Sequence, residues 1–139
     1  MGEGGAGLGF HSHSHRNYGG MSREEIDADA RIGLALLERE IGFRPTSFAF
    51  PYGHYGSYSG EAISELRQHG VEVFFTTEMN RTALPTGGPI SRLVIHPEDD
   101  LQSFRRKLYG GYEWVGTLRR LGYSVANSFR HRSHTASRA

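Results

Sequence analysis

The chain has 139 residues, of which 37% are hydrophobic and 22% charged, a size and balance typical of one globular domain with a modest core. It has no cysteine, which excludes disulfide bonds and thiolate metal sites, and no apolar run of the roughly eighteen residues that would span a membrane. Its net charge of +1 is uneven, because residues 1–104 carry eight arginines against fourteen acids, whereas residues 105–139 hold seven arginines, Lys107 and a single acid, Glu113.

Three histidines follow a glycine-rich start. Residues 1–9 include five glycines and show neither the basic nor the apolar region of a secretory signal, so a cytoplasmic location is the default expectation. Leu8-Gly9-Phe10 is predicted to end a short buried strand. His11, His13 and His15 come next, and the imidazole ring is the commonest protein ligand of catalytic transition metals.

The spacing of these histidines limits how they can share one ion. On a straight strand His11 and His15 would lie about 13 Å apart, because a strand rises about 3.3 Å per residue. Zinc–imidazole bonds are only about 2.1 Å long, so the chain must turn between the two residues. One helical turn would bring them together, and His13 would then point away as a bystander. The alternative is that all three are surface histidines.

The clearest helix signal covers residues 22–41. Ser22 and Glu25 have the spacing of a capping box, in which each side chain bonds to the backbone N–H of the other residue. Gly42 suits a left-handed C-terminal cap, and Pro45 prevents continuation. The apolar residues recur at intervals of three and four and are Ile26, Ala30, Gly33 or Leu34, Leu37 and Ile41.

Shorter elements alternate along the rest of the chain. We predict strands at residues 47–50, 71–77 and 92–95, and helices at residues 59–69, 99–109 and 113–121. The inward-facing residues of the second and third helices would be Ala62, Ile63 and Leu66, and Leu101, Phe104 and Leu108.

This alternation indicates an α/β fold of parallel βαβ units. In such a fold the carboxyl ends of the strands, and the loops that follow them, share one edge of the sheet. The loops at residues 11–15 and 51–53 would lie there, together with His96. Histidines and aromatic residues gathered at that edge are typical of an active site at the top of a barrel.

The motifs at this edge resemble those of the polysaccharide deacetylase family, the NodB homology domain of carbohydrate esterase family 4. The family's His-Ser/Thr-x-x-His motif is matched at residues 11–15, and its Phe-Ala-Tyr/Phe-Pro-Tyr-Gly strand end at residues 48–53. Residues 70–77 resemble a Gly-x-x-x-x-Phe-Thr-Thr stretch, and Ser91-Arg92-Leu93 resembles the arginine-led strand near the end of such domains. The resemblance covers roughly residues 7–110.

The resemblance implies a partial (β/α) barrel of the NodB type and a hydrolase that removes N- or O-acetyl groups from a polysaccharide. A divalent metal, usually zinc, would be held by one Asp and two His, here His11 and His15, and would polarise the acetyl carbonyl and activate a water. The backbone N–H at the family position of Tyr52 would stabilise the oxyanion.

The remaining candidate site residues are less constrained by the resemblance. His96 would be the acid that protonates the leaving amine, although its Leu93-x-x-His96 setting departs from the family's Leu-x-His. Tyr52 and Tyr55 would contact the sugar. The structural alternatives are a loop histidine at residue 96, a packed aromatic strand end at residue 52 and a loop-covering tyrosine at residue 55.

One family motif has no counterpart here. Thr-Phe-Asp-Asp, which supplies the catalytic base and the third metal ligand, should precede the histidines, yet no Asp precedes Asp27. We therefore expect the C-terminal two-thirds of a deacetylase domain at residues 1–116 and an Arg-rich, flexible tail at residues 117–139. The exposed strand edges of an incomplete barrel would favour self-association.

Three functions are compatible with these residues. The first is metal-dependent deacetylation of an acetylated glycan, with turnover impaired by the missing motif. The second is metal or glycan binding without turnover, and the third is anion binding through the basic C-terminal tail. A glycan is the expected partner, and no nucleic acid is expected.

Overall fold

The computed structural model describes residues 7–78, 88–112, 114–115, 117–118 and 121–122. Strands and helices alternate along the chain as predicted. In order, the elements are η1 (Tyr18–Gly20), α1 (Arg23–Ile41), β1 (Ser47–Ala49), α2 (Gly60–Gln68), β2 (Val73–Thr76), β3 (Ile90–Ser91) and α3 (Leu101–Leu108). None of the helices in the described ranges is long and apolar enough to cross a membrane.

The strands form a parallel sheet with the order β1-β2-β3. Phe48 of β1 lies opposite Phe74 of β2, and Thr76 lies opposite Ser91 of β3. On the other side of β1, Phe10 extends the sheet through a parallel bridge to Phe48. All four segments therefore direct their carboxyl ends to one edge, which confirms the predicted partial barrel of parallel βα units.

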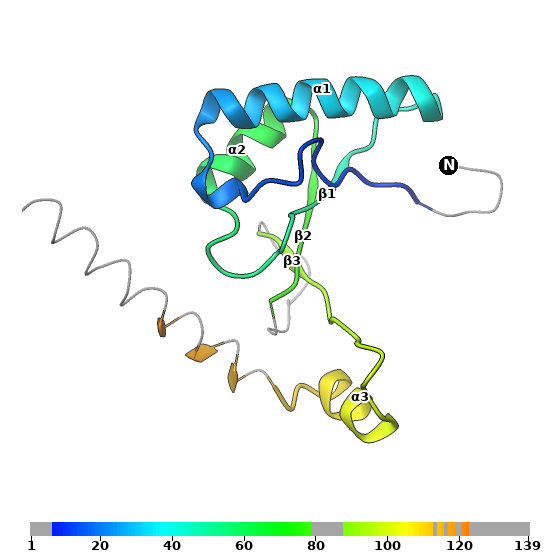
Figure 1. Ribbon diagram of the computed structural model, residues 1–139, viewed down its shortest axis with the longest axis vertical. Coiled ribbons are helices and arrows are strands. Elements are labelled where there is room, and N and C mark those ends of the chain that lie inside the picture. The colour runs from blue at the N-terminus through cyan, green and yellow to red at the C-terminus, as the bar shows by residue number, and fades with distance from the viewer. Residues whose placement is uncertain (1–6, 79–87, 113, 116, 119–120, 123–139) are drawn as a thin grey trace, which may run out of the picture.

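Helices α1 and α2 pack against each other and against the sheet (Figure 1). Most of the predicted inward residues of both helices are confirmed, since Ile26, Ala30, Leu34, Ala62 and Leu66 are buried in the core and Leu37 and Ile63 contact it. Ile41, the last residue of α1, is only half-buried and lies outside this core cluster. The buried core residues are Phe10, Tyr18, Ile26, Ala30, Leu34, Phe48, Phe50, Ala62, Leu66, Val71 and Phe74.

The predicted ends of α1 are also confirmed. The Ser22 hydroxyl accepts from the Glu25 N–H, and the Glu25 carboxylate accepts from the Ser22 N–H at 2.8 Å. Gly42 ends the helix in the left-handed conformation at φ 76°, where its N–H donates to the Glu38 carbonyl. The 19-residue helix thus begins and ends at residues whose chemistry suits those positions.

The strand predicted at residues 92–95 is wrong. The observed β3 lies two residues earlier, at Ile90–Ser91, and no strand is formed at residues 92–95. The Arg92 N–H makes the last bond to β2, on the Thr76 carbonyl, and Thr77 then turns away to donate to the Gly53 carbonyl. Residues 93–95 therefore have no neighbouring strand to pair with.

The predicted third helix exists, but the expected burial of its apolar residues is wrong. Leu101, Phe104 and Leu108 are 66%, 36% and 54% exposed. The reason is that α3 lies apart from α1 and α2, so neither of these two helices covers its apolar residues (Figure 1).

The C-terminal segment is described only in part. Residues 114–115, 117–118 and 121–122 are helical, in the region of the helix predicted at residues 113–121. The rest of the predicted Arg-rich tail at residues 117–139 lies outside the described residues.

Candidate active site

His11 and His15 lie together at the carboxyl edge of the sheet. Their ring centroids are 5.1 Å apart, and the rings meet edge to face. The predicted turn between them is present, but it is a loop with left-handed residues and not a helical turn. Ser12 has φ 70° and His15 has φ 53°, and the His15 N–H donates back to the Ser12 hydroxyl at 2.9 Å.

The His11 ring is oriented by the end of strand β1. Its Nδ1 lies 2.7 Å from the Ala49 carbonyl oxygen. Because a carbonyl only accepts hydrogen bonds, Nδ1 carries the proton and Nε2 keeps its lone pair free. This is the arrangement by which metal-binding histidines are commonly fixed, with one nitrogen held by an acceptor and the other left to bind the ion.

A buried carboxylate in α1 holds the whole histidine loop. The Asp29 side chain accepts from the His13 N–H and the Ser14 N–H, both at 2.9 Å. It also accepts from the hydroxyls of Ser12, Ser14 and Tyr18, at 3.0, 2.5 and 2.5 Å. Five donors converge on one side chain, so the loop conformation depends on Asp29 being ionised.

The electrostatics of Asp29 follow from this geometry. The residue is only 6% exposed, and burial by itself would raise the pKa of its carboxyl. The hydrogen bonds from Ser14, Tyr18 and His13 outweigh burial and lower the pKa of Asp29 to about 2. Burial, reinforced by the neighbouring Asp29, raises the pKa of the Tyr18 hydroxyl.

Asp29 was not among the residues predicted to belong to the site. The available signal was its position, three residues after Ile26 and four before Gly33, on the apolar face of α1. An acid on a buried helix face needs several hydrogen-bond donors, and a loop rich in serine and backbone N–H groups supplies them.

Tyr52 lies beside the two histidines. Its ring centroid is 5.3 Å from that of His15, and its carbonyl accepts from the Thr77 hydroxyl at 2.7 Å. The Tyr52 N–H donates to no acceptor among the described residues. Its φ of 64° is also unusual for an aromatic residue.

Backbone strain is concentrated at this place. Ser12, His15 and Tyr52 are the non-glycine residues with positive φ in the described part of the chain, and all three belong to the site. Strained backbone is costly and tends to gather where function needs a particular geometry.

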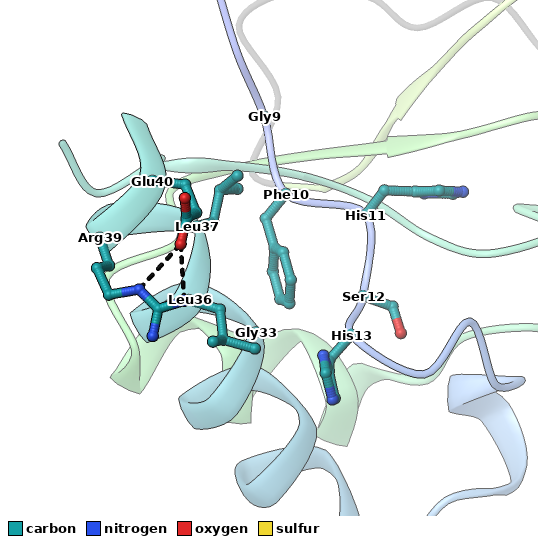
Figure 2. A pocket seen from close by; sticks show the side chains of 10 residues that line it. All are labelled: Gly9, Phe10, His11, Ser12, His13, Gly33, Leu36, Leu37, Arg39 and Glu40. Atoms are coloured by element: carbon teal, nitrogen blue, oxygen red, sulfur yellow. Dashed lines mark hydrogen bonds and ion pairs between the residues drawn. The ribbon is translucent and has the colours of Figure 1, made fainter. Parts of the chain in front are cut away.

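The other candidate residues lie further from this centre. Figure 2 shows the His13 side chain on the α1 side of the loop, whereas the His11 ring points away from α1, which agrees with His13 being a bystander. The carbonyl of Tyr55 accepts from His54 Nδ1 at 2.9 Å. His96 lies between β3 and α3, and no described contact joins it to His11, His15 or Tyr52.

Two cavities of about 420 Å³ each flank the loop. The first lies between the loop and the C-terminal half of α1, and Phe10, Gly33 and Leu36 line it (Figure 2). The second is lined by Gly9, His11, Ser47, Ala49, Phe75 and Arg92. Ser47, Ala49 and Phe75 alternate with the buried Phe48 and Phe74, so this cavity lies on the sheet face away from the helices.

The donor set of the histidine pair is incomplete. Two imidazoles at this separation suit one zinc ion, but a catalytic zinc site normally has three protein ligands and a water. No Asp, Glu or third His among the described residues completes a group with them. Among the described residues, one group of three has ligand atoms that all lie within 4.8 Å of one another. It consists of Asp27, Glu65 and His69, between α1 and α2.

Comparison with known proteins identifies the family. The family model for polysaccharide deacetylases matches residues 1–74, just over half of the chain. The chain belongs to the polysaccharide deacetylase family. The matched region contains His11, His15 and Tyr52, so the site lies within the part that defines the family.

Two solved structures share the fold of this family member. The de-N-acetylase from Aggregatibacter actinomycetemcomitans is 20% identical with a TM-score of 0.53, over 61% of this chain and 31% of that one. IcaB from Ammonifex degensii is 18% identical with a TM-score of 0.56, over 73% of this chain and 46% of that one. The chain therefore corresponds to less than half of each structure.

The curated relatives are matched over a still smaller share. Poly-beta-1,6-N-acetyl-D-glucosamine N-deacetylase of Escherichia coli is 28% identical over 99 residues, which are 71% of this chain and 14% of that protein. Glutamate-1-semialdehyde 2,1-aminomutase of Neisseria meningitidis is 37% identical over 68 residues, which are 49% of this chain and 16% of the aminomutase. Since the two relatives have different names and small matched shares, the family match decides the assignment.

Proposed function

We propose that this chain is part of a deacetylase that removes acetyl groups from an N- or O-acetylated polysaccharide. It would supply the residues that bind the metal ion and the carbonyl oxygen of the acetyl group. The observation that supports the proposal is the clustering of the His11, His15 and Tyr52 rings at the carboxyl edge of a parallel sheet. The backbone N–H of Tyr52 also has no acceptor among the described residues. Family membership and the name of the Escherichia coli relative support an acetylated amino sugar as the substrate class.

The two histidines would be the protein's nitrogen ligands for a divalent ion, for which zinc is the best match to imidazole donors. When bound, such an ion polarises an acyl carbonyl and lowers the pKa of a water. The Ala49 carbonyl keeps His11 in the tautomer with a free Nε2. Asp29 fixes the loop between His11 and His15 by accepting hydrogen bonds from its backbone N–H groups.

Tyr52 would act on the substrate through its backbone. When the water oxygen adds to the acetyl carbon, the carbonyl oxygen becomes negative, and the Tyr52 N–H would donate to it. Breaking the carbon–nitrogen bond then releases acetate and leaves a free amine on the sugar. His96 stays a prediction as the proton donor to that amine, and Tyr55 stays a prediction as a sugar contact.

A second candidate is metal or glycan binding without turnover. The observation that favours it is the absence, among the described residues, of an acid near His11 and His15 that would serve as third ligand and base. Loss of a general base alone costs about 10²–10⁴-fold in rate. In this case the chain would bind zinc and release acetate no faster than a His15→Ala variant.

One experiment separates the two candidates. Zinc binding is measured by calorimetry, and acetate release is measured with an N-acetylated glucosamine oligosaccharide. His15→Ala should weaken zinc binding at this pair at least about tenfold and abolish any acetate release. His13→Ala, in the same loop, is the matched control and should change neither. A His15→Ala protein that binds zinc as the unsubstituted chain does would disprove the ligand assignment.

A further inference from the structure

A second cluster of metal-ligating side chains lies between helices α1 and α2. Asp27 belongs to α1, Glu65 to α2, and His69 caps the C-terminus of α2. Each offers one ligand atom, and these atoms all lie within 4.8 Å of one another. His69 Nε2 lies 3.0 Å from Asp27 Oδ1. Ligands that share one ion with bonds of about 2.1 Å lie no more than about 4.2 Å apart, so a bound ion would draw these three side chains slightly closer together.

This cluster lies on the side of α1 that faces α2. The histidine loop lies on the other side of α1. Asp27 and Asp29 are two residues apart, so they project from opposite sides of α1. Asp29 faces the histidine loop, and Asp27 faces α2. Glu65 and His69 are four residues apart and therefore lie on one face of α2. The cluster is thus separate from the His11 and His15 pair.

The buried side chain of Glu65 has one carboxylate oxygen that a cation could bind. Its side chain is only 7% exposed. Oε2 accepts from Arg23 Nε at 2.5 Å and from Gln68 at 3.2 Å. Oε1 accepts no hydrogen bond from any residue the structure describes. A buried carboxylate oxygen without a donor is costly, and a bound cation would satisfy it.

We propose that Asp27, Glu65 and His69 form a second divalent metal site, of the zinc class, that links α1 to α2. A set of one imidazole nitrogen and two carboxylate oxygens suits zinc. Magnesium and calcium prefer ligand sets made only of oxygen atoms. The ion would take the place of the proton on His69 Nε2, as ligation by imidazole requires. Arg23 stays on Oε2 of Glu65 and offsets part of the negative charge.

The proposal does not depend on the deacetylase assignment, and the test keeps the two apart. The starting protein is the full chain with His11→Ala and His15→Ala, which removes the first pair of ligands. Bound zinc per chain is measured after dialysis, and the melting temperature is followed with and without zinc. We expect about one zinc per chain and a higher melting temperature with zinc, because an ion that binds only the folded protein stabilises it.

Adding His69→Gln to this protein should remove the bound zinc and the rise in melting temperature. Asp27→Asn, at a half-exposed position, should have the same effect if the His69 variant fails to fold. Glu61→Gln, an acid of the same helix outside the cluster, is the matched control and should retain the zinc. The proposal is wrong if the starting protein binds no zinc, if the His69→Gln form still binds it, or if magnesium raises the melting temperature as much as zinc.

Discussion

Asp29 shows how one side chain can organise a site without facing the substrate. It accepts five hydrogen bonds from four residues: Ser12, His13 and Ser14, which separate His11 from His15, and Tyr18 beyond them. Only an ionised carboxylate accepts from so many donors at once. The histidines are therefore placed by a residue that contacts neither imidazole ring in the described contacts.

Replacing Asp29 tests this role. In Asp29→Asn the amide NH₂ would face N–H and O–H donors, so several hydrogen bonds are lost. We expect a loss of about 2–3 kcal/mol in the free energy of unfolding, measured by urea denaturation. Zinc affinity at His11 and His15 should fall as well. Glu40→Gln, in an exposed pair on the same helix, is the control, and equal stability of the two variants would refute the role.

The low pKa of Asp29 also predicts how stability depends on pH. The pKa in the folded state, about 2, lies below the ordinary value of about 3.9. The ionised form therefore stabilises the fold above pH ~4, and this contribution is lost as the pH falls from ~4 to ~2. Unfolding experiments across this range should show about 2 kcal/mol less acid-induced destabilisation in Asp29→Asn than in the unsubstituted chain. Parallel pH profiles for both proteins would contradict the assignment.

Helix α1 is the element that connects the core to the site. One face buries Ile26, Ala30 and Leu34, and Asp29 and Gly33 meet the histidine loop. A Cβ at Gly33 would lie 2.6 Å from two atoms of the Phe10 ring and 2.9 Å from the His13 Cβ. The loop can approach the helix this closely only because residue 33 has no side chain.

Gly33→Ala should therefore destabilise the protein, although alanine is the better helix former by about 1 kcal/mol. We expect overpacking to cost about 1–3 kcal/mol, seen as a lower melting temperature. Gly60→Ala is the matched control, because nothing lies within 4 Å of a Cβ at the start of α2. That control should be neutral or slightly stabilising. A Gly33→Ala protein that melts higher than the unsubstituted chain would show that the loop is free to move away.

The comparison of α1 with β3 and α3 shows what the sequence could and could not predict. The ends of α1 depend on local chemistry at Ser22, Glu25 and Gly42, so they were predictable. The position of β3 depends on where β2 stops, which is set by the distant contact between Thr77 and Gly53. The exposure of α3 depends on what lies beside it, which periodicity does not show.

The same division applies to the site. That His11 and His15 lie together was predictable from the family motif, and so was the need for a turn between them. Their role as metal ligands stays a prediction. The convergence of hydrogen-bond donors on Asp29 was not predictable. Nothing in the sequence of residues 12–18 indicates which residue of the following helix they contact. That an Asp would complete the metal site beside His11 and His15 stays a prediction that rests on the family pattern alone.

At the scale of the whole molecule, several large apolar side chains in the described C-terminal residues are exposed. Leu101, Leu108 and Tyr109 of the α3 region are 66%, 54% and 82% exposed, and Trp114 is 63% exposed. Arg105 and Arg106 lie among them and are also exposed. Apolar patches of this kind mark contact surfaces.

We therefore predict concentration-dependent self-association of the isolated chain. Light scattering coupled to size-exclusion chromatography should show a rising average mass as the protein concentration increases. Leu101→Glu combined with Leu108→Glu should shift the chain toward monomer, and Gln102→Glu, an exposed polar neighbour, should not. A monomer at every concentration tested would exclude both α3 and the strand edges as association surfaces under those conditions.

The histidine site is built almost entirely from one continuous stretch of chain. The contacts described above that place His11, His15 and Tyr52 lie within residues 10–52, apart from the bond between the Thr77 hydroxyl and the Tyr52 carbonyl. Short-range contacts form quickly, and a chain emerging from the ribosome folds its N-terminal part first. The bonds from Asp29 to the histidine loop span at most 17 residues, so the two imidazoles are expected to come together while α2 and β2 are still being synthesised.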